Sequence, residues 1–178
     1  MIDDVERWNR LAALLPDADA RTVRDCWDIG EQEAGLGLLV SGILTHRLPI
    51  SETVRAQLSV LAEDWGEREA LAPRILRCRG DGRASVVELI EHGSSAVGGA
   101  SVRGPSGRDP AHLVLVPWIA CRRCGQVLMR AHDREPWGDL SHLARRYVVV
   151  SPDRSTVRRE FPADAVSHAF EALLNECP

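Results

Sequence analysis

Two cysteines with the spacing of metal ligands occur in the segment Cys121-Arg122-Arg123-Cys124-Gly125. Two thiolates separated by two residues and followed by glycine can point to one zinc ion, as in a zinc knuckle. A structural zinc site has four ligands, and no second pair with this spacing occurs in the chain. The residues that could complete a site are Cys78, His92, His132, His142 and Cys177. Three interpretations therefore stay open: one structural zinc, a redox-active pair, or two reduced cysteines in a hairpin turn without any cofactor.

A second group of candidate functional side chains is acidic. Asp25, Asp28, Glu31 and Glu33 lie just before, or in the first turn of, an apolar segment that begins at Gly35. Carboxylates at the N-terminal end of a helix suit its dipole, so a solvated helix start is one interpretation. The other is an acidic surface that a rigid helix presents to a basic protein partner.

Patterns typical of enzymes are weak or missing. All 22 basic residues are arginine, which excludes a phosphate-binding loop with its lysine and a Schiff base on lysine. The chain has no Gly-x-Ser-x-Gly nucleophile elbow. The acidic and histidine residues from His132 to His142 are better explained as a loop that packs Trp137 and pairs its charges. We therefore expect no enzymatic activity.

Charge divides the chain into two halves. Residues 1–76 hold fourteen Asp and Glu against eight Arg, a net charge of −6. Residues 77–178 hold twelve against fourteen, a net charge of +2. The acidic half argues against nucleic-acid binding there, and the arginines of the second half are interleaved with carboxylates, so we expect no nucleic-acid partner. These arginines are Arg122, Arg123, Arg130, Arg134, Arg145 and Arg146.

The cellular compartment is inferred from membrane-spanning and signal segments that the sequence lacks and from its cysteine content. No run of apolar residues reaches the ~18 needed to span a membrane, and the N-terminus has no basic or apolar signal region. Five cysteines, an odd number, fit a reducing compartment better than a disulfide framework. We expect a cytoplasmic protein without membrane contact.

The first part of the chain, residues 1–77, has the apolar spacing of four or five short helices. Ser51 is a plausible N-cap, Gly30 a C-terminal stop, and Pro73 the start of a short final turn. Gly35, Gly37 and Gly42 in one helix predict a close neighbouring helix. The predicted buried stripe of that helix comprises Leu36, Leu39, Val40, Ile43 and Leu44.

The sequence after residue 77 predicts a different architecture. Residues 78–110 read as a connector with a Gly-, Ser- and Pro-rich loop, in which residues 84–92 suit either a short helix or a strand. Residues 111–178 contain β-branched runs near 112–119, 126–131, 145–150 and 155–161, and then a closing helix after Pro162. The predicted fold class is α+β: an N-terminal helical bundle, then a small antiparallel sheet with a C-terminal helix.

The helical part resembles a known family. The resemblance lies in segments between Leu11 and Trp65, namely Leu11-Ala12-Ala13-Leu14-Leu15-Pro16, Gly30-Glu31, Gly35-Leu36-Gly37-Leu38-Leu39, Leu48-Pro49-Ile50-Ser51 and the helix from Leu58 to Trp65. In these segments the chain is similar to the MafI-like immunity proteins of polymorphic toxin systems. At two positions it departs from their pattern, because the family's alanine is Gly37 here and its helix glutamate is Leu39.

This resemblance implies a small non-enzymatic immunity protein that neutralises a cognate toxin domain by occluding its active site. The acidic residues Asp25, Asp28, Glu31 and Glu33 are then the candidates for partner binding. The alternative is a metal-stabilised regulatory module, in which Cys121 and Cys124 bind zinc and the arginine-rich half binds nucleic acid or protein.

Overall fold

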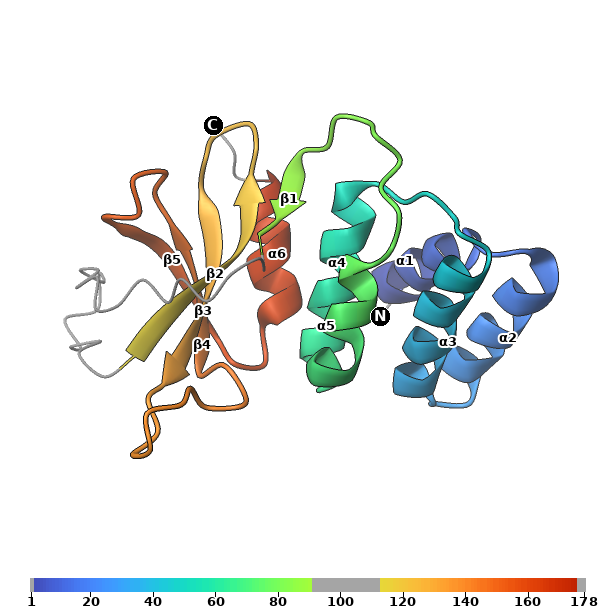
Figure 1. The fold of residues 1–178 in the computed structure, drawn as a ribbon, viewed down its shortest axis with the longest axis horizontal. Coiled ribbons are helices and arrows are strands. Elements are labelled where there is room, and N and C mark those ends of the chain that lie inside the picture. The colour runs from blue at the N-terminus through green and yellow to red at the C-terminus, as the bar shows by residue number, and fades with distance from the viewer. Residues whose placement is uncertain (1, 91–112, 176–178) are drawn as a thin grey trace. The chain divides into compact units, whose positions relative to one another are not determined.

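The computed structural model describes residues 2–90 and 113–175. Within them the chain forms five helices, then a five-stranded antiparallel sheet, then a sixth helix (Figure 1). The predicted α+β class is confirmed. No helix in the described part of the chain is long and apolar enough to cross a membrane.

The helical unit is built from five short helices. Their bounds are α1 Ile2–Ala12, α2 Asp17–Asp28, α3 Gln32–Thr45, α4 Glu52–Asp64 and α5 Arg68–Leu76. The Ser51 side chain accepts a hydrogen bond from the backbone nitrogen of Val54 at 3.2 Å, which confirms it as the N-cap of α4. The prediction for Pro73 was wrong, because Pro73 lies inside α5 and does not begin a turn.

Three tryptophans, Trp8 of α1, Trp27 of α2 and Trp65 just after α4, pack against one another in the bundle, and Trp8 is the buried member. The ring centroid of Trp8 lies 5.6 Å from those of Trp27 and Trp65, and Trp8 donates a hydrogen bond to the carbonyl of Val23 at 3.1 Å. Gly35 makes room for this cluster, since a Cβ there would lie 2.9 Å from Trp8 Cζ2 and 2.9 Å from Cys26 Cβ. The predicted close approach is therefore real, and it is made by α1 and α2.

The predicted stripe of α3 is nearly complete. Leu36, Leu39, Val40 and Ile43 are fully buried, whereas Leu44 is only half-buried. Gly42 also meets a neighbour, because a Cβ there would lie 2.8 Å from a methyl carbon of Leu15. Gly37 faces open space, with no atom within 4 Å of the position that a Cβ would occupy, so it does not contribute to the close packing.

The second unit is a sheet in which neighbouring strands follow one another along the chain. The bounds are β1 Val87–Leu89, β2 Leu113–Cys121, β3 Val127–Asp133, β4 Arg146–Val150 and β5 Val157–Pro162, followed by α6 Val166–Asn175. Each strand pairs antiparallel with the next, and β2 has an irregularity between Pro117 and Ile119. The segment that suited helix or strand therefore contains the edge strand β1.

The two faces of the sheet bury different residues, because side chains alternate along each strand. One face carries the apolar cluster Val127, Met129, Val148, Val150 and Val157. The opposite face carries Leu128, Arg130, His132 and Tyr147. Helix α6 contacts β3, β4 and β5 on that second face, where His168 and Glu171 line a depression together with Arg159 and Phe161.

The chain divides into two compact units, Met1–Ala84 and Ser85–Pro178. The division falls inside the predicted connector 78–110. Residues 78–84 continue the helical unit, where Gly80 forms a β-bridge with Ile50, and Val87–Leu89 belongs to the sheet. The Gly-, Ser- and Pro-rich loop of the prediction lies outside the described residues. The predicted domains 1–77 and 111–178 therefore correspond to the helical bundle and to most of the sheet unit.

Candidate functional site

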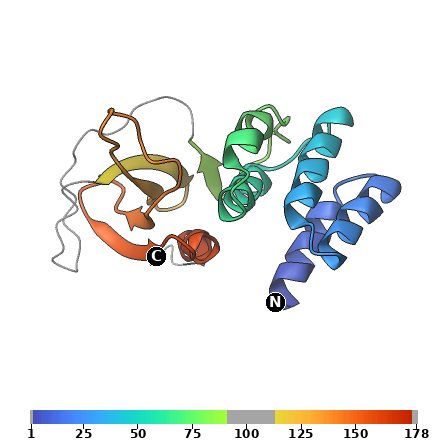
Figure 2. The same cartoon turned by 90° about the horizontal axis from the view of Figure 1, so that it is seen from below.

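The acidic residues are brought together at one end of the α2–α3 hairpin. Asp25 and Asp28 lie in the last turns of α2, Glu31 is the N-cap residue of α3, and Glu33 lies in its first turn. Gly30, with φ +83°, makes the tight connection, in which the backbone nitrogen of Glu31 donates to the carbonyl of Cys26 at 2.8 Å. Helices α2 and α3 run side by side from this end (Figure 2).

All four carboxylates of this acidic tip (Asp25, Asp28, Glu31 and Glu33) are exposed, and none forms an ion pair with a described residue. The helix dipole accounts for only two of them. It favours Glu31 and Glu33 at the N-terminal end of α3 but disfavours Asp25 and Asp28 at the C-terminal end of α2. No basic residue occupies the last turn of α2 to compensate.

Two apolar side chains on the same hairpin are exposed, and sequence reasoning missed both. Ile29, the C-cap residue of α2 inside the acidic tip, is 73% exposed, and Leu38 of α3 is 44% exposed. A signal was present in both cases. Leu38 falls outside the buried stripe of its helix, and Ile29 directly precedes the helix-ending Gly30.

A groove with a volume of about 230 Å³ runs between α2 and α3. Residues that line it include Asp19 and Thr22 from α2, Leu38, Ser41 and Thr45 from α3, and His46. At the end away from the acidic tip, His46 Nε2 lies 2.7 Å from a carboxylate oxygen of Asp19 and ties the two helices together. The groove is therefore shallow, partly apolar and fixed at one end.

Leu39, the position at which the resemblance to the MafI-like family would expect a helix glutamate, is 0% exposed in the core of the bundle. A partner cannot touch this position in the folded protein, so acidic recognition on this chain has to come from other residues. The acidic tip is the place where exposed carboxylates gather on the same hairpin.

The Cys-x-x-Cys segment forms the turn between β2 and β3. Cys121 ends β2 and is buried, whereas Cys124 is half-buried in the turn. Gly125 has φ +73°, the left-handed conformation expected after a second ligand, and its nitrogen donates to the carbonyl of Cys121 at 2.9 Å. Neither cysteine forms a disulfide with a described residue. The local geometry thus suits a metal turn and an ordinary hairpin equally.

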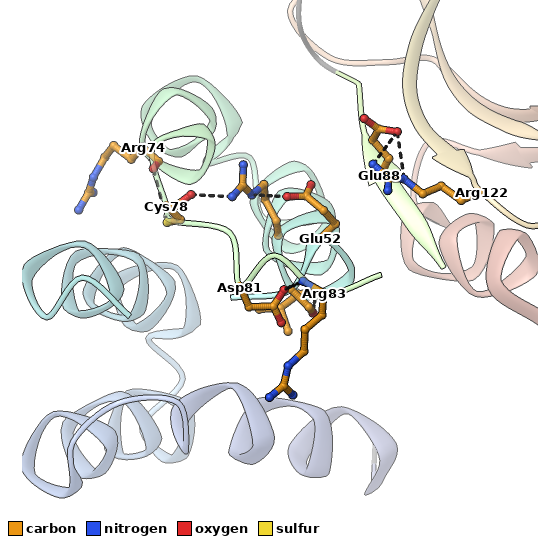
Figure 3. A network of polar contacts seen from close by, with 10 residues as sticks. Glu52, Arg74, Cys78, Asp81, Arg83, Glu88 and Arg122 are labelled. Atoms are coloured by element: carbon orange, nitrogen blue, oxygen red, sulfur yellow. Dashed lines mark hydrogen bonds and ion pairs between the residues drawn. The ribbon is translucent and has the colours of Figure 1, made fainter. Parts of the chain in front are cut away.

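The residues proposed to complete a zinc site are dispersed. Cys78 belongs to the helical unit, where its thiol lies 3.6 Å from the carbonyl of Arg74 (Figure 3). Burial raises the pKa of Cys78 despite the opposing charges of Arg55 and Arg74, so this thiol is a poor metal ligand. His132 Nδ1 lies 2.8 Å from the carbonyl of Ser141. His92 and Cys177 lie outside the described residues.

Among residues 2–90 and 113–175, no group of three or more histidine, cysteine, aspartate or glutamate side chains could hold a metal ion. A zinc site at Cys121 and Cys124 stays a prediction that requires ligands from elsewhere.

Several arginines of the sheet unit have partners within that unit. Arg122 lies 3.0 Å from Glu88 (Figure 3), Arg123 donates to the carbonyl of Leu174 at 2.7 Å, and Arg146 pairs with Glu160 at 3.3 Å. Arg145 is bound to Asp133, and this hydrogen bond raises the pKa of its guanidinium. Arginines that are neutralised within their own unit contribute little to a basic surface.

Arg130, one of the arginines counted in the arginine-rich half, does not lie on the surface. It is only 2% exposed, and its guanidinium carbon lies 5.0 Å from the ring centroid of Trp118. The sequence of β3 is consistent with this burial, because Arg130 lies in an apolar strand in which side chains alternate between two faces. Trp118 also packs against Tyr147, with centroids 6.1 Å apart.

The loop between β3 and β4 differs from the prediction in one respect. Trp137 does not pack against the protein but is 73% exposed, and Leu143 is 59% exposed. Near the loop, an ion pair joins Asp133, at the end of β3, to Arg145, just before β4, whereas Arg134 donates to the carbonyl of Gly138. Ser141 holds the loop, because its hydroxyl accepts from the nitrogen of Asp133 at 3.1 Å and donates to the carbonyl of Leu143 at 2.8 Å.

Comparisons with known proteins give no relative from which a role could be transferred. No protein-family model, no curated protein and no solved structure matches this chain.

Proposed function

We propose that the protein is a non-enzymatic binding protein of the immunity type, which neutralises a cognate toxin domain by covering its active site. The contact is made by the acidic tip of the α2–α3 hairpin. A toxin that cleaves nucleic acid has a basic substrate surface, and this is the surface that a cluster of carboxylates complements.

One observation supports the proposal above all. Asp25 and Asp28 stand at the negative end of α2 without an ion-pair partner among the described residues, where they reduce the stability of the helix. Exposed Ile29 lies between them and Glu31. A feature that costs stability in the free protein is explained when a partner supplies the missing positive charge and covers the isoleucine.

The electrostatics predict how such a complex behaves. Long-range attraction between an acidic and a basic surface raises the association rate by about 10- to 1000-fold, and salt screens it. Exposed ion pairs add little affinity, so the side chains buried at the centre of the contact determine the dissociation rate. We therefore expect a salt-dependent association rate and a dissociation rate that depends on salt only weakly.

The test begins with the genes that neighbour the one encoding this chain. The immunity hypothesis expects one of them to encode a long secreted protein with a toxic C-terminal domain. That domain is expressed in cells with and without the present chain. Survival only in the presence of the chain, together with a 1:1 complex of the purified proteins, is the expected result. The absence of such a neighbour, or cell death despite co-expression, contradicts the proposal.

A charge variant tests the acidic tip. The fourfold change Asp25→Asn, Asp28→Asn, Glu31→Gln and Glu33→Gln should lower the association rate at least tenfold at low salt. The matched control removes four negative charges elsewhere, at Glu6, Glu135, Asp139 and Asp164. Equal effects of the two variants would show that net charge, not the tip, guides association.

The alternative of a nucleic-acid-binding module has less support. The arginines that would form its surface are paired with Glu88, Asp133 and Glu160 or bound to backbone, and Arg130 is buried. Salt-sensitive binding of the full chain to DNA or RNA would favour this alternative.

A further inference from the structure

We propose that the groove between α2 and α3 receives one face of a basic amphipathic helix, with apolar side chains of that helix seated against Leu38 and Ile29. This inference deepens the proposed function, because it names the chemistry of the partner surface. It rests on the proposed function only for the identity of the protein that carries the helix.

The two walls of the groove continue toward the acidic tip. Thr22, Asp25 and Ile29 follow one another at intervals of three and four residues, so they lie on one face of α2. On α3 the exposed residues Ala34, Leu38 and Thr45, with half-buried Ser41 between them, have the same spacing and form the facing wall. The result is a continuous surface along the length of the hairpin.

The two exposed apolar side chains lie on opposite walls of this surface. Leu38 on α3 lines the groove together with Thr22, and Ile29 lies seven residues, about 10 Å or two helical turns, beyond Thr22 at the end of α2. A helix laid along the groove can therefore meet both Leu38 and Ile29 with apolar side chains on one of its faces.

Charge decides which occupant fits. The end of the surface at Ile29 is surrounded by the four carboxylates of the acidic tip, whereas the acid at the other end, Asp19, is already paired with His46. The occupant therefore carries its basic residues around the side chain that meets Ile29. A second copy of this hairpin would bring carboxylates against carboxylates, and an anionic lipid surface would be repelled in the same way.

The probe is a set of synthetic 16-residue peptides titrated into the full-length, nitrogen-15-labelled protein. The first peptide has leucines at i, i+3 and i+7 and four arginines near the last of these. The second has alanines in place of the leucines, and the third has glutamates in place of the arginines. A fourth carries the arginines at the opposite end.

We expect the first peptide to bind at micromolar concentrations and to shift the amide signals of Thr22, Ile29, Leu38 and Thr45. The alanine, glutamate and reversed peptides should each bind at least tenfold more weakly. Ile29→Ser and Leu38→Ser should each weaken the first peptide at least tenfold. Both side chains are exposed, so each change should lower the melting temperature by no more than a few degrees. The matched control is Leu143→Ser, another exposed leucine, which should leave binding unchanged.

Three results overturn the inference: equal binding of the leucine and alanine peptides, shifts centred on Trp137 and Leu143, or no shift at millimolar peptide. The proposed function fails separately. A toxin domain that is neutralised by the Ile29→Ser and Leu38→Ser variants as well as by the wild type rejects the groove but keeps the immunity function. Peptide binding without any neutralised toxin keeps the groove and rejects that function.

Discussion

Arg47 adopts a backbone conformation that glycine prefers. It follows the C-cap of α3 with φ +52°, and the nitrogen of Leu48 donates to the carbonyl of Ile43 at 3.0 Å, as in a Schellman motif. A residue with a Cβ loses about 1 kcal/mol in this region. We expect Arg47→Gly to raise the free energy of unfolding by about that amount and the melting temperature by a few degrees.

The control for Arg47 is Arg77, the C-cap residue of α5, which has an ordinary φ of −81°. Arg77→Gly should give no gain and can lose up to about 1 kcal/mol through the entropy of the unfolded chain. A gain of equal size at both positions, measured by denaturant unfolding, would mean that loss of charge and not backbone geometry is responsible.

Asp153 in the β4–β5 turn is a carboxyl group whose surroundings lower its pKa. Hydrogen bonds from Ser151 and then from the hydroxyl and nitrogen of Ser155 lower its pKa to about 2. Because the folded-state pKa lies below the ordinary value, the ionised form stabilises the turn above about pH 4. This contribution is lost as the pH falls from about 4 to about 2.

Removing one donor should shift the titration. Ser155→Ala is expected to raise the pKa of Asp153 toward the usual value of a carboxyl group, as followed by carbon-13 NMR of the side chain. Ser141→Ala, which removes a hydroxyl in the β3–β4 loop, serves as the control. A midpoint for Asp153 that is the same in wild type and Ser155→Ala would show that the turn does not hold the carboxylate.

The cysteine pair allows a direct decision on zinc. If Cys121 and Cys124 hold a structural ion, protein purified without chelator contains about one zinc per chain, and Cys124→Ser removes it and destabilises the sheet unit. Cys124 is the better position to change, because it is half-buried whereas Cys121 is buried. Elemental analysis without zinc, with a change in stability within about 1 kcal/mol, would leave the pair as plain hairpin residues.

At the scale of the element, the glycines of α3 have opposite roles. Gly35→Ala places a methyl group 2.9 Å from Trp8 and Cys26 atoms, so we expect a loss of about 1–3 kcal/mol from overpacking. Gly37→Ala meets no atom within 4 Å and should gain about 0.5–1 kcal/mol from helix propensity. Thermal unfolding of the two variants measures the difference, and equal signs would contradict the packing.

Elements with a repeating apolar pattern could be predicted from the sequence, and those defined by pairing could not. Leu36, Leu39, Val40 and Ile43 identified the buried face of α3, because burial follows the period of the helix. The three residues of β1 carry no such period. They become a strand because Val87 and Leu89 pair with Cys121 and Ile119, which are distant in the sequence.

The candidate site was predictable only in its charged part. The carboxylates of the acidic tip were visible as a cluster, since polar residues near helix ends stay exposed. Ile29 and Leu38 were not, because apolar type alone predicts burial and only the packed bundle leaves these two side chains in solvent. Arg130 is the reverse case, a charged residue that the ring of Trp118 holds in the interior.

At the scale of the whole molecule, the two units each have a core of their own, so the helical unit should fold alone. We expect a fragment of residues 1–84 to show a helical circular dichroism spectrum and a single cooperative thermal transition. A fragment of residues 1–64 is the control, because it lacks Trp65 and the buried Leu71 and Ile75 of α5. A non-cooperative transition of the 1–84 fragment would contradict the independence of the unit.

The tryptophan cluster has a consequence for the newly made chain. Trp8 comes from the first helix, whereas Trp65 follows the end of the fourth, and their rings lie in contact. Such a distant contact cannot form until the fourth helix has left the ribosome. Until then Trp8 can pack against Trp27 and the Gly35 side of α3 but lacks the ring of Trp65, so the bundle completes its packing only when the last ring arrives.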